Sequence, residues 1–203
     1  NINRENVSSF DTEIIKKAKS VKEVRESMDV TQCKLVIGMR TGIAAPDEDV
    51  PALILMNALF GGSAQSKLFL NVREKLSLCY YCSSRYNKHK GLIFVESGVE
   101  QNKIEEARKE ILNQLKEIKI GNFTESDFSE TKLFLSQRIK GTSDSLSSLN
   151  SWYVSQVALE KIQTPDELIE KLNEVTREKV IEVANKITLD TVYVLESKKK
   201  ESE

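Results

Sequence analysis

The chain has 203 residues, of which 39% are hydrophobic and 30% are charged, and its net charge is −1. A chain of this length can bury about 70% of its unfolded surface, which is enough for a hydrophobic core. Its charges are evenly mixed and it has neither a long basic stripe, a long apolar run nor a signal-peptide pattern, so we expect no nucleic-acid partner and no membrane span.

The order along the chain predicts a polar start, one folded domain and a short tail. Residues 1–29 are interpreted as a connector from a preceding domain, and residues 21–26 within it fit either an edge strand or a short amphipathic turn. The domain is predicted to cover residues 30–196, and its first strand, 34–40, is apolar and rich in β-branched residues. Residues 197–203 form a charged tail with no reason to fold.

Two helices are predicted after the first strand. Acidic residues 47–49 precede an apolar helix over 52–60, where the helix N-terminus favours negative charge. Gly61 is predicted to end that helix as its C′ residue. Either Ser63 or Ser66 can cap the second helix.

A hairpin and a run of helices follow. Residues 79–86 and 92–99 predict two strands joined by a loop over 87–91. Helices are predicted to begin after Gln101, at Thr124, at Ser143 or Asp144, at Thr164 and at Thr176. Residues 191–195 predict a closing strand. This order favours an α+β fold over an alternating βαβ fold.

The three cysteines indicate a reducing, cytoplasmic setting, because an odd count argues against a disulfide scaffold. Cys79 and Cys82 form a C-x-x-C pair, which could bind metal or perform redox chemistry. Strand alternation is expected to place the two side chains on opposite faces, and no Cys or His cluster supplies further ligands. A structural role is therefore favoured for Cys79 and Cys82, and a solvated loop position for the one histidine, His89.

The most informative segment places Arg73 seven residues before Tyr80, across a predicted helix end and strand start. The residues that precede this segment are Leu59-Phe60-Gly61-Gly62, followed by Ser66-Lys67-Leu68-Phe69. From spacing alone, Arg73 is interpreted as a surface residue favoured by the helix dipole, and Tyr80 as a strand residue with high β propensity.

Residues 59–80 closely resemble the C-terminal half of the insulinase/pitrilysin/mitochondrial-processing-peptidase superfamily of zinc peptidases. The zinc motif H-x-x-E-H cannot be present, because the chain has a single histidine. The resemblance implies an α+β fold with a mostly antiparallel sheet and helices packed on one face. It also implies one half of a clamshell that closes around a peptide chamber.

The resemblance gives Arg73 and Tyr80 a catalytic role, in which they bind the substrate carbonyl beside a zinc ion held by the other half. It implies no cofactor in this chain, zinc in the complete enzyme, and two partners: a peptide substrate and an N-terminal zinc-bearing half or subunit. Family members often have Gly-Leu-Ala-Tyr or Leu-Gly-Tyr here, whereas this chain has Ser77-Leu78-Cys79-Tyr80. This chain alone is expected not to be a protease.

Two alternatives to the interpretation of this chain as one half of a peptidase stay open. Some members of the superfamily have lost the zinc motif and serve as non-catalytic partners of an active chain. A free-standing peptide-binding module is a second alternative, which the polar connector disfavours.

Overall fold

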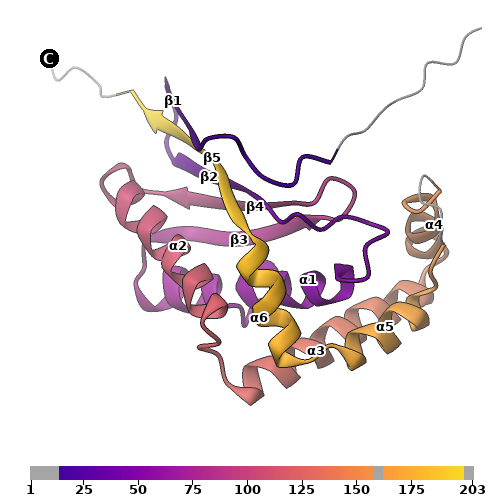
Figure 1. Ribbon diagram of the computed structural model, residues 1–203. Helices are drawn as coiled ribbons and strands as arrows, with labels where there is room; N and C mark the ends of the chain where they lie inside the picture. Colours follow the sequence, from indigo (N-terminus) through magenta and orange to yellow (C-terminus); the bar gives the residue numbers. More distant parts are fainter. Residues whose placement is uncertain (1–13, 158–161, 199–203) are drawn as a thin grey trace, which may run out of the picture.

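The computed structural model describes residues 14–157 and 162–198. The described residues form a five-stranded sheet, and the helices gather against one side of it (Figure 1). The strands are β1 (Lys22–Met28), β2 (Cys33–Arg40), β3 (Cys79–Asn87), β4 (Leu92–Val99) and β5 (Thr188–Ser197). Their order across the sheet is β1-β5-β2-β4-β3. The pair β1–β5 is parallel and the other three pairs are antiparallel, which confirms the predicted α+β class.

The strand β1 resolves the choice left open for residues 21–26. It is an edge strand whose seven residues are all exposed, and it pairs with β5 from Lys22 opposite Thr191 to Met28 opposite Ser197. Charged residues on this strand suit an edge, because they discourage pairing with another chain.

The helical segments mostly begin where local signals place them. They are α1 (Val50–Asn57), η1 (Ala58–Gly62), η2 (Leu68–Lys75), η3 (Gln101–Lys103), α2 (Ile104–Lys119), α3 (Glu125–Lys140), η4 (Gly141–Asp144), α4 (Leu146–Val154), α5 (Pro165–Glu174) and α6 (Arg177–Lys186). Thr124, Thr164 and Thr176 are N-caps, as predicted. The predicted start of α4 is one or two residues early, because Ser145 is its cap. No helix in residues 14–157 or 162–198 has the length and apolar character to cross a membrane.

The core lies between the sheet and the helices. Cys33, Leu35, Ile37 and Met39 alternate along β2 and are all buried on the helix side. Side chains of β4, α1, α2 and α6 complete the same cluster. One face of the sheet is therefore packed, as is usual for an antiparallel sheet of this kind.

The prediction that Gly61 ends its helix is wrong. The helix continues past α1 as the π-helical segment η1 through Gly62, and Ser63 is its cap. A Cβ atom on Gly61 would lie 2.7 Å from Leu68 Cδ1 and 2.7 Å from both the backbone N and Oγ of Ser84. Glycine is therefore required here for the close approach of the helix to β3, which positions the surface described next.

Candidate functional site

The structure brings Arg73 and Tyr80 together at one exposed corner of the sheet. Arg73 lies in the last turn of η2, a π-helix, and its Nε donates a hydrogen bond to the backbone oxygen of Tyr80 at 2.9 Å. Its guanidinium carbon lies 4.7 Å from the centre of the Phe69 ring, and its Nη1 lies 3.3 Å from Oε1 of Glu74. These contacts hold the planar guanidinium close to the start of β3.

A β-bulge in β3 determines the position of Tyr80. Cys79 is paired with Val99 and Tyr81 with the adjacent Gly98, so Tyr80 is the extra residue of the bulge. A bulged residue leaves the regular alternation of the strand and can be directed to a new position. Tyr80 is 58% exposed, and with Arg73 it lines a surface cavity of about 420 Å³.

The turn between Arg73 and Tyr80 depends on Ser77, which has φ +50°. Within residues 14–157 and 162–198 it is the one non-glycine residue with a positive φ. Leu78 N donates to Val72 O at 3.0 Å and Lys103 Nζ donates to Ser77 O at 3.2 Å. The serine thus adopts the left-handed conformation that glycine adopts most easily.

The expectation that Cys79 and Cys82 point to opposite faces is wrong, because the bulge shifts the alternation by one residue. Cys79 pairs with Val99 and Cys82 with Ser97, so both thiols lie on the helix side of the sheet. The hydrogen bond from Cys82 lowers the pKa of Cys79 to about 7, against the effect of burial, and Ser97 and Arg73 also favour its thiolate. The same contact and burial raise the pKa of Cys82. All three cysteines are free thiols.

The residues at this corner do not fit a zinc site. Zinc sites in proteins use three or four Cys, His or carboxylate ligands that converge on one point. Among the described residues, no group of three or more His, Cys, Asp and Glu side chains is arranged to hold a metal ion. His89 lies in the β3–β4 loop, where burial and the charge of Lys88 lower its pKa.

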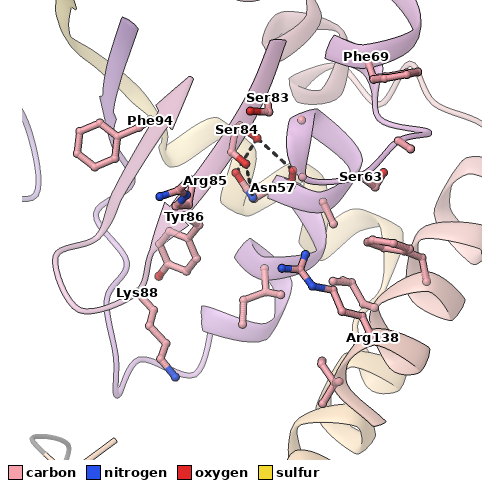
Figure 2. Close-up of a pocket in the computed structure, with 18 of the residues that line it drawn as sticks. Asn57, Ser63, Phe69, Ser83, Ser84, Arg85, Tyr86, Lys88, Phe94 and Arg138 are labelled. Carbon is pink, nitrogen blue, oxygen red and sulfur yellow. Dashed lines mark hydrogen bonds between the residues drawn. The ribbon is translucent and has the colours of Figure 1, made fainter. Parts of the chain in front are cut away.

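A second, larger cavity of about 930 Å³ runs along β3 and was not anticipated from the sequence (Figure 2). Its walls come from three strand and loop segments, β3, β4 and the β3–β4 loop, and from the helical segments α1, η1, η2, α3, η4, α4 and α5. At its floor, Ser84 Oγ donates a hydrogen bond to Oδ1 of Asn57 at 2.8 Å. Helices that precede and follow the β3–β4 hairpin in the chain complete it, and no local sequence pattern marks residues that meet only through packing.

Comparison with known proteins places this chain among peptidase domains. A family profile described as "Peptidase M16 inactive domain" matches residues 2–135. A Bacillus subtilis (strain 168) protein named "Probable inactive metalloprotease YmfF" is 41% identical over 174 residues, which cover 86% of this chain and 41% of that protein. Another, "Uncharacterized zinc protease YmxG", is 28% identical over 166 residues, covering 78% of this chain and 39% of that protein. The chain spans about two fifths of the length of these relatives.

Solved structures show the same fold. A conserved protein from Enterococcus faecalis V583 superimposes with a TM-score of 0.83 at 29% identity, over 91% of this chain and 44% of that one. A peptidase M16 inactive domain from Pseudomonas fluorescens gives 0.70 at 16% identity, over 92% of this chain and 45% of that one.

Proposed function

Since the chain belongs to the peptidase M16 family and matches its inactive domain, we propose that it is the substrate-binding half of a zinc-dependent peptidase. The zinc ion, its ligands and the general base would lie on an N-terminal half or a partner subunit. The observation that carries the proposal is the pairing of Arg73 with Tyr80 on an exposed corner, at the spacing that the family motif requires.

The chemistry of these two side chains suits peptide-bond hydrolysis. Negative charge develops on the substrate carbonyl oxygen in the transition state, and one preorganised donor to that oxygen contributes roughly 3 kcal/mol. Because Nε of Arg73 already bonds to the backbone of Tyr80, the terminal nitrogens and the Tyr80 hydroxyl are the groups proposed to meet the substrate. Arg supplies a planar fork of donors here that Lys cannot provide.

A non-catalytic partner subunit is the second candidate. It is supported by the name of the 41% identical relative, "Probable inactive metalloprotease". In that case the same corner would bind a peptide or an active chain without hydrolysis. An H-x-x-E-H motif elsewhere in the complete protein or in its partner favours the peptidase, and its absence favours the partner. For either candidate the three free thiols favour a reducing compartment, and we propose the cytoplasm.

The test compares peptide turnover with stability in the assembled protein. Arg73→Ala and Tyr80→Phe are each expected to lower turnover by roughly 10²-fold, because they act on charge that grows in the transition state. Tyr80 is exposed, so Tyr80→Phe should change the free energy of unfolding by within about 0.5 kcal/mol. Arg73→Ala removes the hydrogen bond to the Tyr80 backbone and should lower it by about 0.5–1.5 kcal/mol, which is less than its expected effect on turnover.

Ile111→Ala is the matched core control. Ile111 is fully buried, whereas Leu112 beside it is only partly buried. The alanine at 111 should destabilise the fold by roughly 2–5 kcal/mol and leave the turnover of the folded fraction unchanged. If an active assembly with Arg73→Ala or Tyr80→Phe kept the turnover of the parent, these residues would have only a structural role.

A further inference from the structure

Cys79 and Cys82 are a pair of thiols that the proposed function does not use. Cys79 pairs with Val99 of β4 and Cys82 with Ser97, so the two cysteines are neighbours on the helix side of the sheet. Val99 and Ser97 are two residues apart, which corresponds to about 6.8 Å along an antiparallel strand. This spacing lies at the upper end of the range of about 4.4–6.8 Å between Cα atoms that a disulfide joins. The bulge at Tyr80 thus permits a bond that a regular strand, with the two side chains on opposite faces, would exclude.

The two thiols differ in their access to solvent. Cys79 is partly exposed and lines the surface cavity of about 420 Å³ next to Arg73 and Lys103, whereas Cys82 is 4% exposed. The hydrogen bond from Cys82 is the main reason that the pKa of Cys79 is lowered to about 7, so about half of Cys79 is thiolate at neutral pH. A dissolved oxidant therefore reaches a reactive sulfur at Cys79 and meets the sulfur of Cys82 only through it.

Ser97 places a buried hydroxyl beside the two thiols. It is 1% exposed, and its Oγ has no hydrogen-bond partner within the part of the chain that the structure describes. The hydroxyl acts to lower the pKa of both cysteines, because a donor stabilises a thiolate. An unpaired buried hydroxyl costs free energy, so donation to an anionic sulfur here is favourable. Ser97 is therefore suited to stabilise the thiolate of Cys79 that an oxidant attacks.

The third cysteine lies too far away to compete. Cys33 pairs with Val99 from the side of β2, and Cys79 pairs with Val99 from the side of β3. Two strand spacings of about 4.8 Å separate Cys33 from Cys79, which exceeds the limit of about 7 Å between Cα atoms for a disulfide. The sheet therefore selects Cys82 as the partner of Cys79.

We propose that Cys79 and Cys82 form a reversible disulfide when a hydroperoxide oxidises Cys79, which makes this pair a redox-sensitive site of the chain. Cytosolic disulfides are usually transient and redox-sensing, which agrees with a pair that is free in the reduced state. The proposal goes beyond the proposed function and does not depend on it. The ring that the bond closes contains Tyr80 and Tyr81, so the redox state of the pair bears directly on the conformation of the bulge.

The reaction has two balanced steps. The Cys79 thiolate attacks one oxygen of the hydroperoxide, the O–O bond breaks, and the departing oxygen takes a proton, which leaves Cys79 as a sulfenic acid. The Cys82 sulfur then attacks the Cys79 sulfur, the S–O bond breaks, and the Cys82 proton leaves with the oxygen as water. Two thiols are oxidised to one disulfide and the peroxide is reduced. Formation of the neutral sulfenic acid also removes the thiolate of Cys79, whose hydrogen bond and charge, together with burial, raise the pKa of Cys82.

The experiment treats the purified full chain with hydrogen peroxide near neutral pH and maps its cysteines by mass spectrometry. A parallel sample contains dimedone, which traps sulfenic acid. The variants are Cys82→Ala, which removes the second thiol, and Cys79→Ser, which removes the first. Cys33→Ser is the matched control, and circular dichroism establishes that each variant is folded. Because Cys79 is partly exposed, Cys79→Ser keeps the test decisive even if Cys82→Ala does not fold.

The parent and Cys33→Ser should lose two hydrogens in a bond between residues 79 and 82, and dithiothreitol should restore both thiols. In Cys82→Ala, Cys79 should be trapped by dimedone and should pass in excess peroxide to sulfinic acid, which dithiothreitol does not reverse. In Cys79→Ser, Cys82 should stay reduced under the conditions that oxidise the parent. The proposal is overturned if Cys79 of the parent passes to sulfinic acid without a disulfide, if the bond involves Cys33 or a second chain, or if Cys82 is oxidised equally fast in Cys79→Ser.

Discussion

The Nε atom of Arg73 donates a hydrogen bond to the backbone oxygen of Tyr80 at 2.9 Å, across a turn in which Ser77 has a positive φ. The two residues are close because the π-helix η2 ends beside the β-bulge of β3. Their relative position therefore depends on a short piece of backbone rather than on a distant part of the core. This dependence makes the turn the first feature to test.

Substitution of Ser77 should separate backbone conformation from side-chain chemistry. A non-glycine residue in the left-handed region costs roughly 1–2 kcal/mol, whereas glycine costs the unfolded chain roughly 0.5–1 kcal/mol in entropy. We expect Ser77→Gly to raise the free energy of unfolding by less than about 1 kcal/mol. Ser77→Val should lower it by about 1–3 kcal/mol, because a β-branched residue tolerates a positive φ poorly. Urea denaturation of both variants measures the difference, and equal stabilities would contradict the assigned turn.

Cys79 should be the most reactive thiol of the chain. It is partly exposed and its pKa is lowered to about 7, whereas Cys33 and Cys82 are only 3% and 4% exposed. Since the thiolate is the nucleophile, its rate of alkylation by iodoacetamide should rise as the pH passes through about 7. Mass spectrometry of the labelled peptides identifies the residue that reacts first.

Cys82→Ala is the control for that prediction. It removes the hydrogen bond that contributes most to the low pKa of Cys79, so the midpoint of the alkylation profile should move toward the ordinary thiol value of about 8.5. An unchanged midpoint, or alkylation of Cys33 at the same rate in the native protein, would show that the contact between the two thiols is absent.

The contact between Asp49 and α6 should make stability depend on pH in acid. Asp49 is the N-cap of α1, its side chain is 16% exposed, and its carboxylate lies 2.7 Å from Nζ of both Lys179 and Lys186. Burial acts to raise the pKa of Asp49, but the hydrogen bonds and charges of the two lysines outweigh it, so the pKa lies below its ordinary value. The contact therefore stabilises the fold above the unfolded-state pKa of about 3.9, and this contribution is lost as the pH falls through the lower folded-state pKa.

Asp49→Asn tests this dependence. It should lower the free energy of unfolding by about 1 kcal/mol near pH 7, and by much less below about pH 3, where the parent carboxyl is protonated. Glu170→Gln, which neutralises an exposed acid of α5, should show little effect at either pH. Urea denaturation at the two pH values gives the comparison, and a constant difference between Asp49→Asn and the parent would contradict the assigned role.

The sequence alone determined the features that depend on neighbouring residues. The caps at Thr124, Thr164 and Thr176 form within one helical turn, so their side chains identify the helix starts directly. The alternation of β2 likewise predicts its buried face. The motif in residues 59–80 was sufficient to indicate the family, and the family profile confirms it.

Features that depend on strand pairing, or on the close approach of segments distant in the chain, were decided only by the tertiary structure. The bulge at Tyr80 exists because β3 has one more residue than the opposite stretch of β4, and that register reverses the predicted facing of Cys82 relative to Cys79. Gly61 appeared to be a helix stop, but it is required by the nearness of Ser84, which is more than 20 residues away in the chain. The 930 Å³ cavity along β3 is formed by residues from distant segments, and its shape depends on how the helices pack on the sheet. Local propensity does not record such contacts, because their geometry is determined by the whole core.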